Sequence, residues 1–182
     1  GLFYDFQNNL LFSTEHGPQG GDEINVNSNP NKNNIQNFGW PISSYGEHYG
    51  QEQGWSEKVK NNKDLLNENP LYKKAPLYKS HKDYGFVEPI RYFTPSIGIT
   101  EILKVNNSPN NLYKILVASM GYDKEEDDMT LHILDFDKKF NLKNYEKIYI
   151  GERIRDLIDL NNGSVLMTLE SSGSLGLISN IY

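Results

Sequence analysis

Short apolar runs of strand length recur along this chain and constrain its fold more than any other feature. From Ser96 onward a run begins about every twelve residues, and turn-forming residues separate the runs. Several runs alternate apolar and polar side chains, as in Thr130–Phe136, and no amphipathic helix separates them. This rhythm predicts an all-β fold of antiparallel strands, as in a sandwich, barrel or propeller. The expected strands are Asn9–Ser13, Glu23–Val26, Ile97–Val105, Lys114–Met120, Thr130–Asp135, Glu146–Ile150, Arg153–Leu160, Ser164–Leu169 and Leu175–Ile181.

The segment from Gly46 to Asp83 interrupts this rhythm. It is polar, contains two prolines and several lysines, and shows no clear periodicity, although Glu57–Leu66 could form a short surface helix. A stretch of this length without periodicity is usually an excursion loop. We therefore predict a single unit over residues 1–182, with a polar loop excursion at about 46–83.

Composition excludes several classes of protein. Lys and Arg number 18 against 24 Asp and Glu, so the net charge is −6, and no basic block offers a footprint for nucleic acid. No apolar run approaches the roughly 18 residues that a membrane-spanning helix needs. The absence of cysteine excludes disulfides, thiolate catalysis and cysteine-based zinc sites. The chain starts at Gly1 without a signal-peptide pattern, so we expect it to be a piece of a longer protein.

The most distinctive motif is the glycine-rich loop over Glu15–Glu23. Three glycines and a proline force an irregular backbone whose carbonyls can turn outward. These carbonyls, beside Glu15, Asp22 and Glu23, are hard oxygen donors of the kind that Ca²⁺ prefers. The alternative is an ordinary β-turn in which Asp22 caps loop amides, and composition alone favours that alternative.

A second motif places two arginines, Arg153 and Arg155, in one predicted strand. Residues two apart in a strand share a face, so both guanidiniums point the same way. Two neighbouring cations repel unless an anion lies between them, so the pair suits a ligand carboxylate or phosphate. A structural ladder satisfied by Glu152, Asp156 or Asp159 explains the pair equally well.

Other candidate catalytic groups lack partners in the sequence. No two of the four histidines have metal-ligand spacing, and Ser171–Ser174 has no His–Asp pattern nearby. Asn162-Gly163-Ser164 matches a glycosylation acceptor, but Asn-Gly between apolar runs favours a hairpin turn.

Taken together and in order, the motifs resemble the glucose/sorbosone dehydrogenase family. These are soluble sugar dehydrogenases that depend on pyrroloquinoline quinone (PQQ), and they include the aldose sugar dehydrogenases. The resemblance covers most of the chain and is weak across Gln51–Asp83. It implies a six-bladed β-propeller, of which this chain would be the C-terminal three to four blades. The motifs that carry it are Glu15–Asn25, Asn37–Pro41, Tyr92–Ile97, Leu116–Met120, Arg153–Leu157 and Asn162–Ser164.

The resemblance also implies metal ligands. The carbonyls of Gly17 and Pro18 would bind the Ca²⁺ that coordinates the quinone. Glu23 matches a ligand of a second, structural calcium in some members of the family.

The resemblance assigns four further residues to the active site. Asp22 matches an acidic residue that orients the catalytic base or the substrate, and Ser96 matches a hydroxyl residue that contacts the cofactor. Arg153 and Arg155 match the two arginines that bind the carboxylates of PQQ. The family's catalytic histidine lies upstream of the matching portion, so this chain is expected to be inactive alone.

The implied activity is oxidation of the anomeric hydroxyl of an aldose, with hydride transfer to PQQ and assistance from Ca²⁺. The implied partners are a sugar substrate, an electron acceptor and the N-terminal half of the same propeller, in the periplasm or outside the cell. An alternative is a non-catalytic, calcium-binding propeller that binds carbohydrate or protein. It is based on the long polar middle segment and on Gly121, because some family members have at that position a lysine that polarises a cofactor oxygen.

Overall fold

The described residues fold into β-strands joined by turns and loops. The computed structural model describes residues 1–17, 20–32, 35–40, 42–46, 77–78, 81–106, 111–121 and 128–181. Within these residues, one short 3₁₀ turn, η1 (Lys82–Tyr84), accompanies the strands, and no helix there is long and apolar enough to cross a membrane. The strands are β1 (Leu2–Asp5), β2 (Leu10–Glu15), β3 (Asp22–Asn27), β4 (Ser43–Ser44), β5 (Leu77–Tyr78), β6 (Arg91–Phe93), β7 (Ile99–Lys104), β8 (Tyr113–Ser119), β9 (Thr130–Phe136), β10 (Leu142–Tyr149), β11 (Ile154–Asp159), β12 (Ser164–Leu169) and β13 (Leu175–Ser179).

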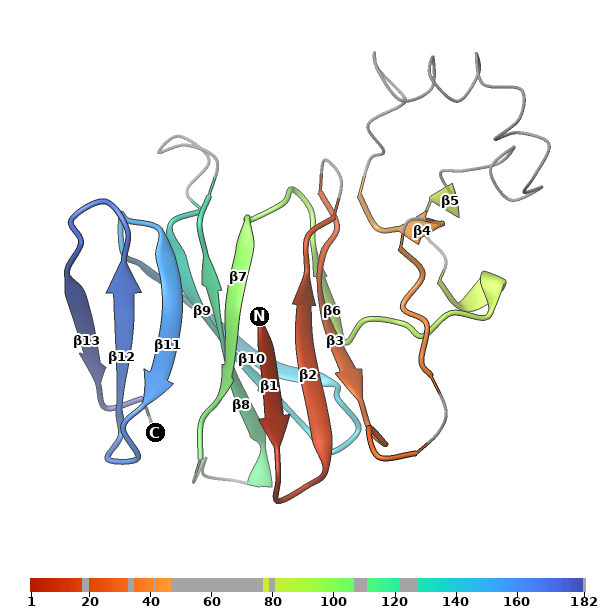
Figure 1. The fold of residues 1–182 in the computed structure, drawn as a ribbon, viewed down its shortest axis with the longest axis horizontal. Helices are drawn as coiled ribbons and strands as arrows, with labels where there is room; N and C mark the ends of the chain where they lie inside the picture. Colours follow the sequence, from red (N-terminus) through yellow and green to blue (C-terminus); the bar gives the residue numbers. More distant parts are fainter. Residues whose placement is uncertain are drawn as a thin grey trace, which may run out of the picture.

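Three antiparallel sheets stand side by side along the chain (Figure 1). The first has strand order β1-β2-β3-β6, the second β10-β9-β8-β7, and the third β11-β12-β13. Apart from β3 and β6, which pair across the polar excursion, the strands that pair in these three sheets are neighbours in the chain, as short turns between apolar runs require. The succession of similar antiparallel sheets is the arrangement expected of consecutive propeller blades.

The second sheet lies between the other two sheets, and its central strands β8 and β9 are buried on both faces. All seven residues of β9 are buried, including the polar residues of its alternating pattern. In β8, Ile115 and Val117 belong to the core against the first sheet, whereas Leu116 and Ala118 belong to the core against the third. Alternating side chains of one strand therefore stabilise two interfaces.

The hairpin predicted at Asn162-Gly163 joins β11 to β12. Asn161 and Gly163 both have positive φ angles, of 58° and 85°. Asn and Gly tolerate this left-handed conformation better than other residues, so local sequence determines the turn.

The polar excursion begins and ends in a two-stranded parallel pair. Ser43 pairs with Leu77 and Ser44 with Tyr78, so the two ends of the segment lie side by side. Most of the predicted excursion at 46–83, including the helix expected at Glu57–Leu66, lies outside the described residues.

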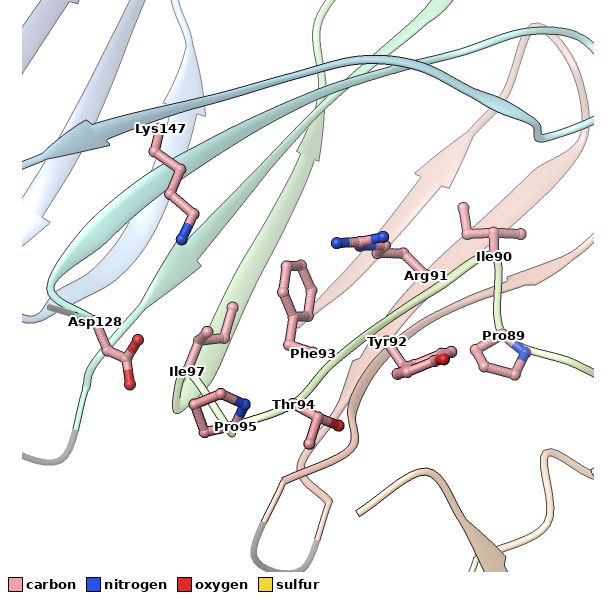
Figure 2. Close-up of a pocket in the computed structure, with 10 residues that line it drawn as sticks. All are labelled: Pro89, Ile90, Arg91, Tyr92, Phe93, Thr94, Pro95, Ile97, Asp128 and Lys147. Atoms are coloured by element: carbon pink, nitrogen blue, oxygen red, sulfur yellow. The ribbon is translucent and has the colours of Figure 1, made fainter. Parts of the chain in front are cut away.

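Several connections between strands gather at one end of the sheets, the upper edge in Figure 1. They are the β2–β3 loop, the β6–β7 and β10–β11 connections and the β12–β13 turn. Close to this edge, a cavity of about 560 Å³ lies between the first and second sheets (Figure 2).

Candidate functional site

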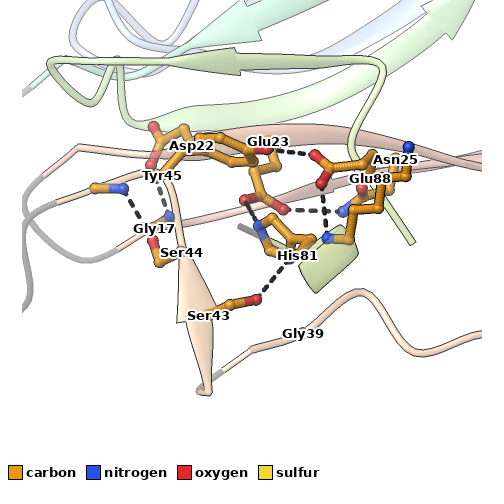
Figure 3. Close-up of polar contacts among 12 residues, drawn as sticks. Gly17, Asp22, Glu23, Asn25, Gly39, Ser43, Ser44, Tyr45, His81 and Glu88 are labelled. Carbon is orange, nitrogen blue, oxygen red and sulfur yellow. Dashed lines mark hydrogen bonds and ion pairs between the residues drawn. The ribbon is translucent and has the colours of Figure 1, made fainter. Parts of the chain in front are cut away.

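Asp22, the first residue of β3, is the centre of the hydrogen bonds at this edge. Its Oδ1 accepts from the Gly17 N–H at 2.9 Å and from the Ser96 hydroxyl at 3.0 Å. Its Oδ2 accepts from the N–H groups of Ile97 and Ile99, both at 3.0 Å. Asp22 is fully buried, and Figure 3 shows its bond to Gly17 of the glycine-rich loop. Through the bonds from Ile97 and Ile99, it joins this loop of the first sheet to the start of the second.

These four bonds match the alternative in which Asp22 caps loop amides. A carboxylate has about four lone-pair sites, so the chain itself saturates this one. Among the described residues, the nearest histidine nitrogen is Nδ1 of His16, 4.0 Å from Oδ1, on a side chain that is 57% exposed. The orienting role implied for Asp22 therefore stays a prediction, while its hold on the loop is part of the structure.

The backbone of the loop requires its glycines. Gly20 and Gly21 have φ angles of 97° and 76°, and a Cβ on Gly17 would overlap the backbone of both. The Gly20 N–H donates to the Ser96 hydroxyl oxygen at 2.9 Å. Carbonyls of such a tight, side-chain-free loop fit a hard cation such as Ca²⁺. Pro18, the other carbonyl expected to bind calcium, lies outside the described residues.

Glu23 lies on the buried side of the same strand in a network that the sequence did not predict. Its Oε1 is 2.9 Å from His81 Nε2, and its Oε2 accepts from the Asn25 amide at 3.4 Å. His81 Nδ1 is in turn 2.9 Å from the Ser43 hydroxyl. Burial opposes the imidazolium form, but the hydrogen bond and charge of Glu23 and the charge of Glu88 together raise the pKa of His81.

Glu23 was expected to bind calcium, and in this network His81 and Asn25 each contact one of its carboxylate oxygens. A carboxylate has about four lone-pair sites, so these two contacts leave acceptor sites open and the calcium role of Glu23 stays a prediction. His81 lies 58 residues from Glu23 along the chain and has no metal-like spacing. No local signal in the sequence could have identified the pair.

The segments around the network are fastened by aromatic residues. The Tyr45 hydroxyl donates to Glu88, and the Tyr45 ring stacks on Tyr92 with centroids 4.1 Å apart. Burial, followed by the hydrogen bond to Glu88, raises the pKa of Tyr45. Burial and the neighbouring Glu23 raise the pKa of Glu15, at the end of β2. The flanks of the polar excursion are thus held on the first sheet.

The two predicted arginines share a face, as their spacing in the sequence indicated. Arg153 Nη1 lies 3.3 Å from Glu170 Oε1, and Arg155 Nε donates to Glu170 Oε2. The hydrogen bond and charge of Arg155, with a smaller contribution from Arg153, hold the pKa of Glu170 below its usual value. Two cations on one carboxylate leave one positive charge at a surface where the arginines are 38% and 48% exposed.

The anion between the arginines is not one of the three residues that the sequence suggested. Glu170 follows β12, and the pairing of Ile154 with Leu169 brings it beside them. A register irregularity between Ile154 and Asp156 accompanies this pairing. Glu152 instead accepts from the N–H of Ser172 at 2.8 Å.

The arginine pair and Asp22 lie along one edge. Ile97 and Gly98 accept backbone hydrogen bonds from Gly121 and Met120, at 3.0 and 2.8 Å. Arg155 in turn contacts the sulfur of Met120. A chain of contacts therefore links the glycine-rich loop of the first sheet, through the start of the second sheet, to the arginines of the third.

Gly121 has a backbone that only glycine adopts easily. Its φ is 55°, and a Cβ there would lie 3.0 Å from the Cβ of Asp128. A lysine at this position would be strained in both respects. The local backbone therefore explains why this chain has glycine at position 121, where some family members have lysine.

The sequence matches the family described as Glucose / Sorbosone dehydrogenase over residues 1–177. The fold first defines a class, that of the β-propeller proteins. The chain belongs to the glucose/sorbosone dehydrogenase family. Both the family and the partial propeller expected from the motifs are confirmed.

Curated relatives extend well beyond this chain. An uncharacterized protein of Synechocystis (slr1608) is 25% identical over 94% of the chain and 36% of its own length. The aldose sugar dehydrogenase YliI of Escherichia coli is 27% identical over 92% of the chain and 38% of its own length. The chain therefore spans little more than a third of these relatives.

Solved structures show the same fold. The soluble aldose sugar dehydrogenase of Escherichia coli, solved in the apo-form, superposes with a TM-score of 0.64 at 20% identity. It is matched over 97% of this chain and 43% of its own. A glucose dehydrogenase gives the same TM-score at 18% identity, covering 97% of this chain and 42% of its own.

Proposed function

We propose that this chain forms the cofactor-binding part of a sugar dehydrogenase that uses PQQ and Ca²⁺ to oxidise the anomeric hydroxyl of an aldose. The observation that carries the proposal is the pair Arg153 and Arg155, which converge on one exposed carboxylate at the same edge of the sheets as the glycine-rich loop. An unbalanced positive charge at an accessible edge suits a ligand with several carboxylates.

Within this proposal, each residue has a role that fits its surroundings. PQQ, when bound, supplies a two-electron acceptor, and Ca²⁺ supplies Lewis acidity. Arg153 and Arg155 would hold the cofactor's carboxylates. The carbonyls of Gly17 and Pro18 would bind the calcium. Glu23 would bind a second, structural calcium through the acceptor sites that His81 and Asn25 leave open.

Asp22 and Ser96 would position the groups of the site and would not transfer protons. The Ser96 hydroxyl donates to Asp22 and accepts from the Gly20 N–H, so one lone pair remains. In this state Ser96 can only accept from a ligand. Asp22 keeps the loop and Ser96 in place, so it orients the site without itself exchanging a proton.

The proposal includes the rest of the enzyme. The sugar, the electron acceptor and the catalytic histidine would meet this chain in the complete protein, in the periplasm or outside the cell. We propose that residues 1–182 supply part of its propeller, with the excursion at about 46–83 as an insertion.

The direct test is a dye-reduction assay of the full-length protein with PQQ and Ca²⁺. We expect the dye to be reduced only when an aldose is present. Dye reduction should stop when a chelator removes the calcium. Stoichiometric binding of PQQ without turnover on any aldose would contradict the enzymatic proposal.

That outcome would favour a second candidate, a non-catalytic calcium-binding propeller for carbohydrate or protein. The observation in its favour is Gly121, whose backbone resists the lysine found in some members.

A further inference from the structure

A cavity at the outer side of the first two sheets holds a cluster of cations that the proposed function does not use. It lies between β6 and the start of β9, and β10 covers it from the other side (Figure 2). Strands β6 and β10 are each the last strand of their sheet. The cavity measures about 560 Å³, which falls in the range of small-molecule sites. Its walls include Arg91, Tyr92, Phe93, Thr94, Asp128 and Lys147.

Arg91 lies on this wall without a charged partner among the described residues. Its guanidinium carbon is 5.6 Å from the ring centre of Phe93 and 5.4 Å from that of Tyr145. Its Nε is buried and makes no hydrogen bond in the part of the chain that the structure describes. Stacking on two rings fixes the plane of the guanidinium and leaves its N–H groups available.

Lys147 adds a second cation from the opposite strand. Its side chain extends from β10 into the cavity (Figure 2), and its ammonium is 5.8 Å from the Tyr145 ring centre. No described carboxylate forms an ion pair with it.

The two cations also affect the pKa of the buried His132. Burial, and then the charges of Lys147 and Arg91, lower the pKa of His132 to about 4. His132 is therefore neutral and leaves the two cations as the positive charges of the cavity, with Asp128 as the one acid among its lining residues.

We propose that this cavity binds a small organic anion through a carboxylate or phosphate group held between Arg91 and Lys147. The planar guanidinium fork matches either oxyanion, and the ammonium contributes a second point charge. Pro89, Ile90 and Pro95 also line the cavity and are not buried, so they offer apolar contact area to the rest of the molecule. The volume exceeds that of a bare ion, so the occupant is a molecule about the size of an acidic or phosphorylated sugar. The proposal does not depend on the activity proposed above.

The test is calorimetric titration of the full-length, PQQ-free protein with inorganic phosphate, glucose 6-phosphate, glucuronate and, as the neutral comparison, glucose. We expect an anionic sugar to bind more tightly than glucose, with an affinity that falls as salt is added. Preference for glucose 6-phosphate or for glucuronate identifies the oxyanion. Failure of every anion to bind overturns the proposal.

Two variants place the binding in this cavity. Lys147→Met alters an exposed side chain and should weaken binding roughly tenfold, the loss of one charge-assisted contact. Arg91→Met should weaken it at least as much. Lys139→Met removes another exposed charge, in the turn between β9 and β10, and should leave the affinity unchanged. Binding that survives Lys147→Met but is lost in Arg155→Ala would overturn the proposal, because the anion would then occupy the arginine pair.

Discussion

Asp22 and Glu170 are carboxylates at the same edge of the sheets, but they meet opposite surroundings. Asp22 is fully buried and accepts four hydrogen bonds from the chain's own loop and backbone. Glu170 is 36% exposed and lies between two arginines, which it only half neutralises. The first cluster is complete without a ligand and holds the fold. The second retains charge and access, which an anionic cofactor needs.

Replacing Asp22 with alanine should produce the largest effect on stability. The change leaves the N–H groups of Gly17, Ile97 and Ile99 without their acceptor, and each buried unpaired group costs about 1–3 kcal/mol. We expect the free energy of unfolding of the full-length protein to fall by roughly 3–5 kcal/mol, measured by urea denaturation.

Asp156→Ala is the matched control, because Asp156 is exposed and, within the described part of the chain, accepts only from the neighbouring N–H of Leu157. Its cost should stay below about 1 kcal/mol. Equal losses in the two variants would contradict the view of Asp22 as a structural hub.

The arginine pair should show the reverse pattern. Arg153→Ala with Arg155→Ala should weaken PQQ binding by several kcal/mol, at roughly 1.5–3 kcal/mol per charge-assisted bond. Exposed ion pairs contribute little to folding, so the unfolding free energy should change by about 1 kcal/mol or less. Titration with PQQ, followed by urea denaturation of the same variant, measures both quantities.

Glu170→Gln sharpens this result, because it removes the anion that competes for the two arginines. PQQ affinity should then be equal to or higher than that of the wild type. If the double arginine variant loses stability but keeps its PQQ affinity, the pair is a structural ladder and the contrast with Asp22 disappears.

Ser96→Ala tests whether Ser96 stabilises the fold, as Asp22 does, or binds the cofactor, as we propose for the arginine pair. The hydroxyl bridges the Gly20 N–H and Asp22, so its loss should destabilise the protein by about 1 kcal/mol. Ser164→Ala, at an exposed hydroxyl, should cost less than about 0.5 kcal/mol. If Ser96→Ala leaves stability unchanged and lowers only PQQ affinity, Ser96 belongs with the arginines and not with Asp22.

The sequence predicted the parts of this edge that depend on local pattern. Alternation and turn residues placed the nine expected strands to within about four residues, and Ser164–Leu169 is found as predicted. The strands β1, β4, β5 and β6 were not among them. Spacing alone put Arg153 and Arg155 on one face. The glycines of the loop indicated an irregular backbone, which the φ angles of Gly20 and Gly21 confirm.

What the sequence could not predict depends on register between distant strands. Glu170 reaches the arginines because Ile154 pairs with Leu169, and no residue near Arg153 indicates that pairing. His81 and Glu23 meet because the polar excursion returns to the first sheet. Full burial of β9 follows from its place between two other sheets, which alternation within one strand cannot reveal.

The Glu23–His81 pair is a third kind of cluster, buried like Asp22 but able to titrate. Glu23, its main favourable partner, raises the pKa of His81 above the ordinary 6.5. A histidine whose pKa is raised by folding contributes stability that is fully present below pH 6.5. That contribution is lost as the pH rises through the raised value. The wild type should therefore lose stability between about pH 6 and alkaline pH, as measured by urea midpoints across that range.

Glu23→Gln is the variant that separates this effect from general alkaline destabilisation. The amide keeps a hydrogen-bonding oxygen near His81 but removes the charge that favours the imidazolium. Its urea midpoint should depend less on pH than that of the wild type over the same range. Parallel pH profiles for the two proteins would show that His81 is neutral in the folded state. In that case Glu23 and His81 would be a plain buried hydrogen bond, and the contrast with the arginine pair would rest on Asp22 alone.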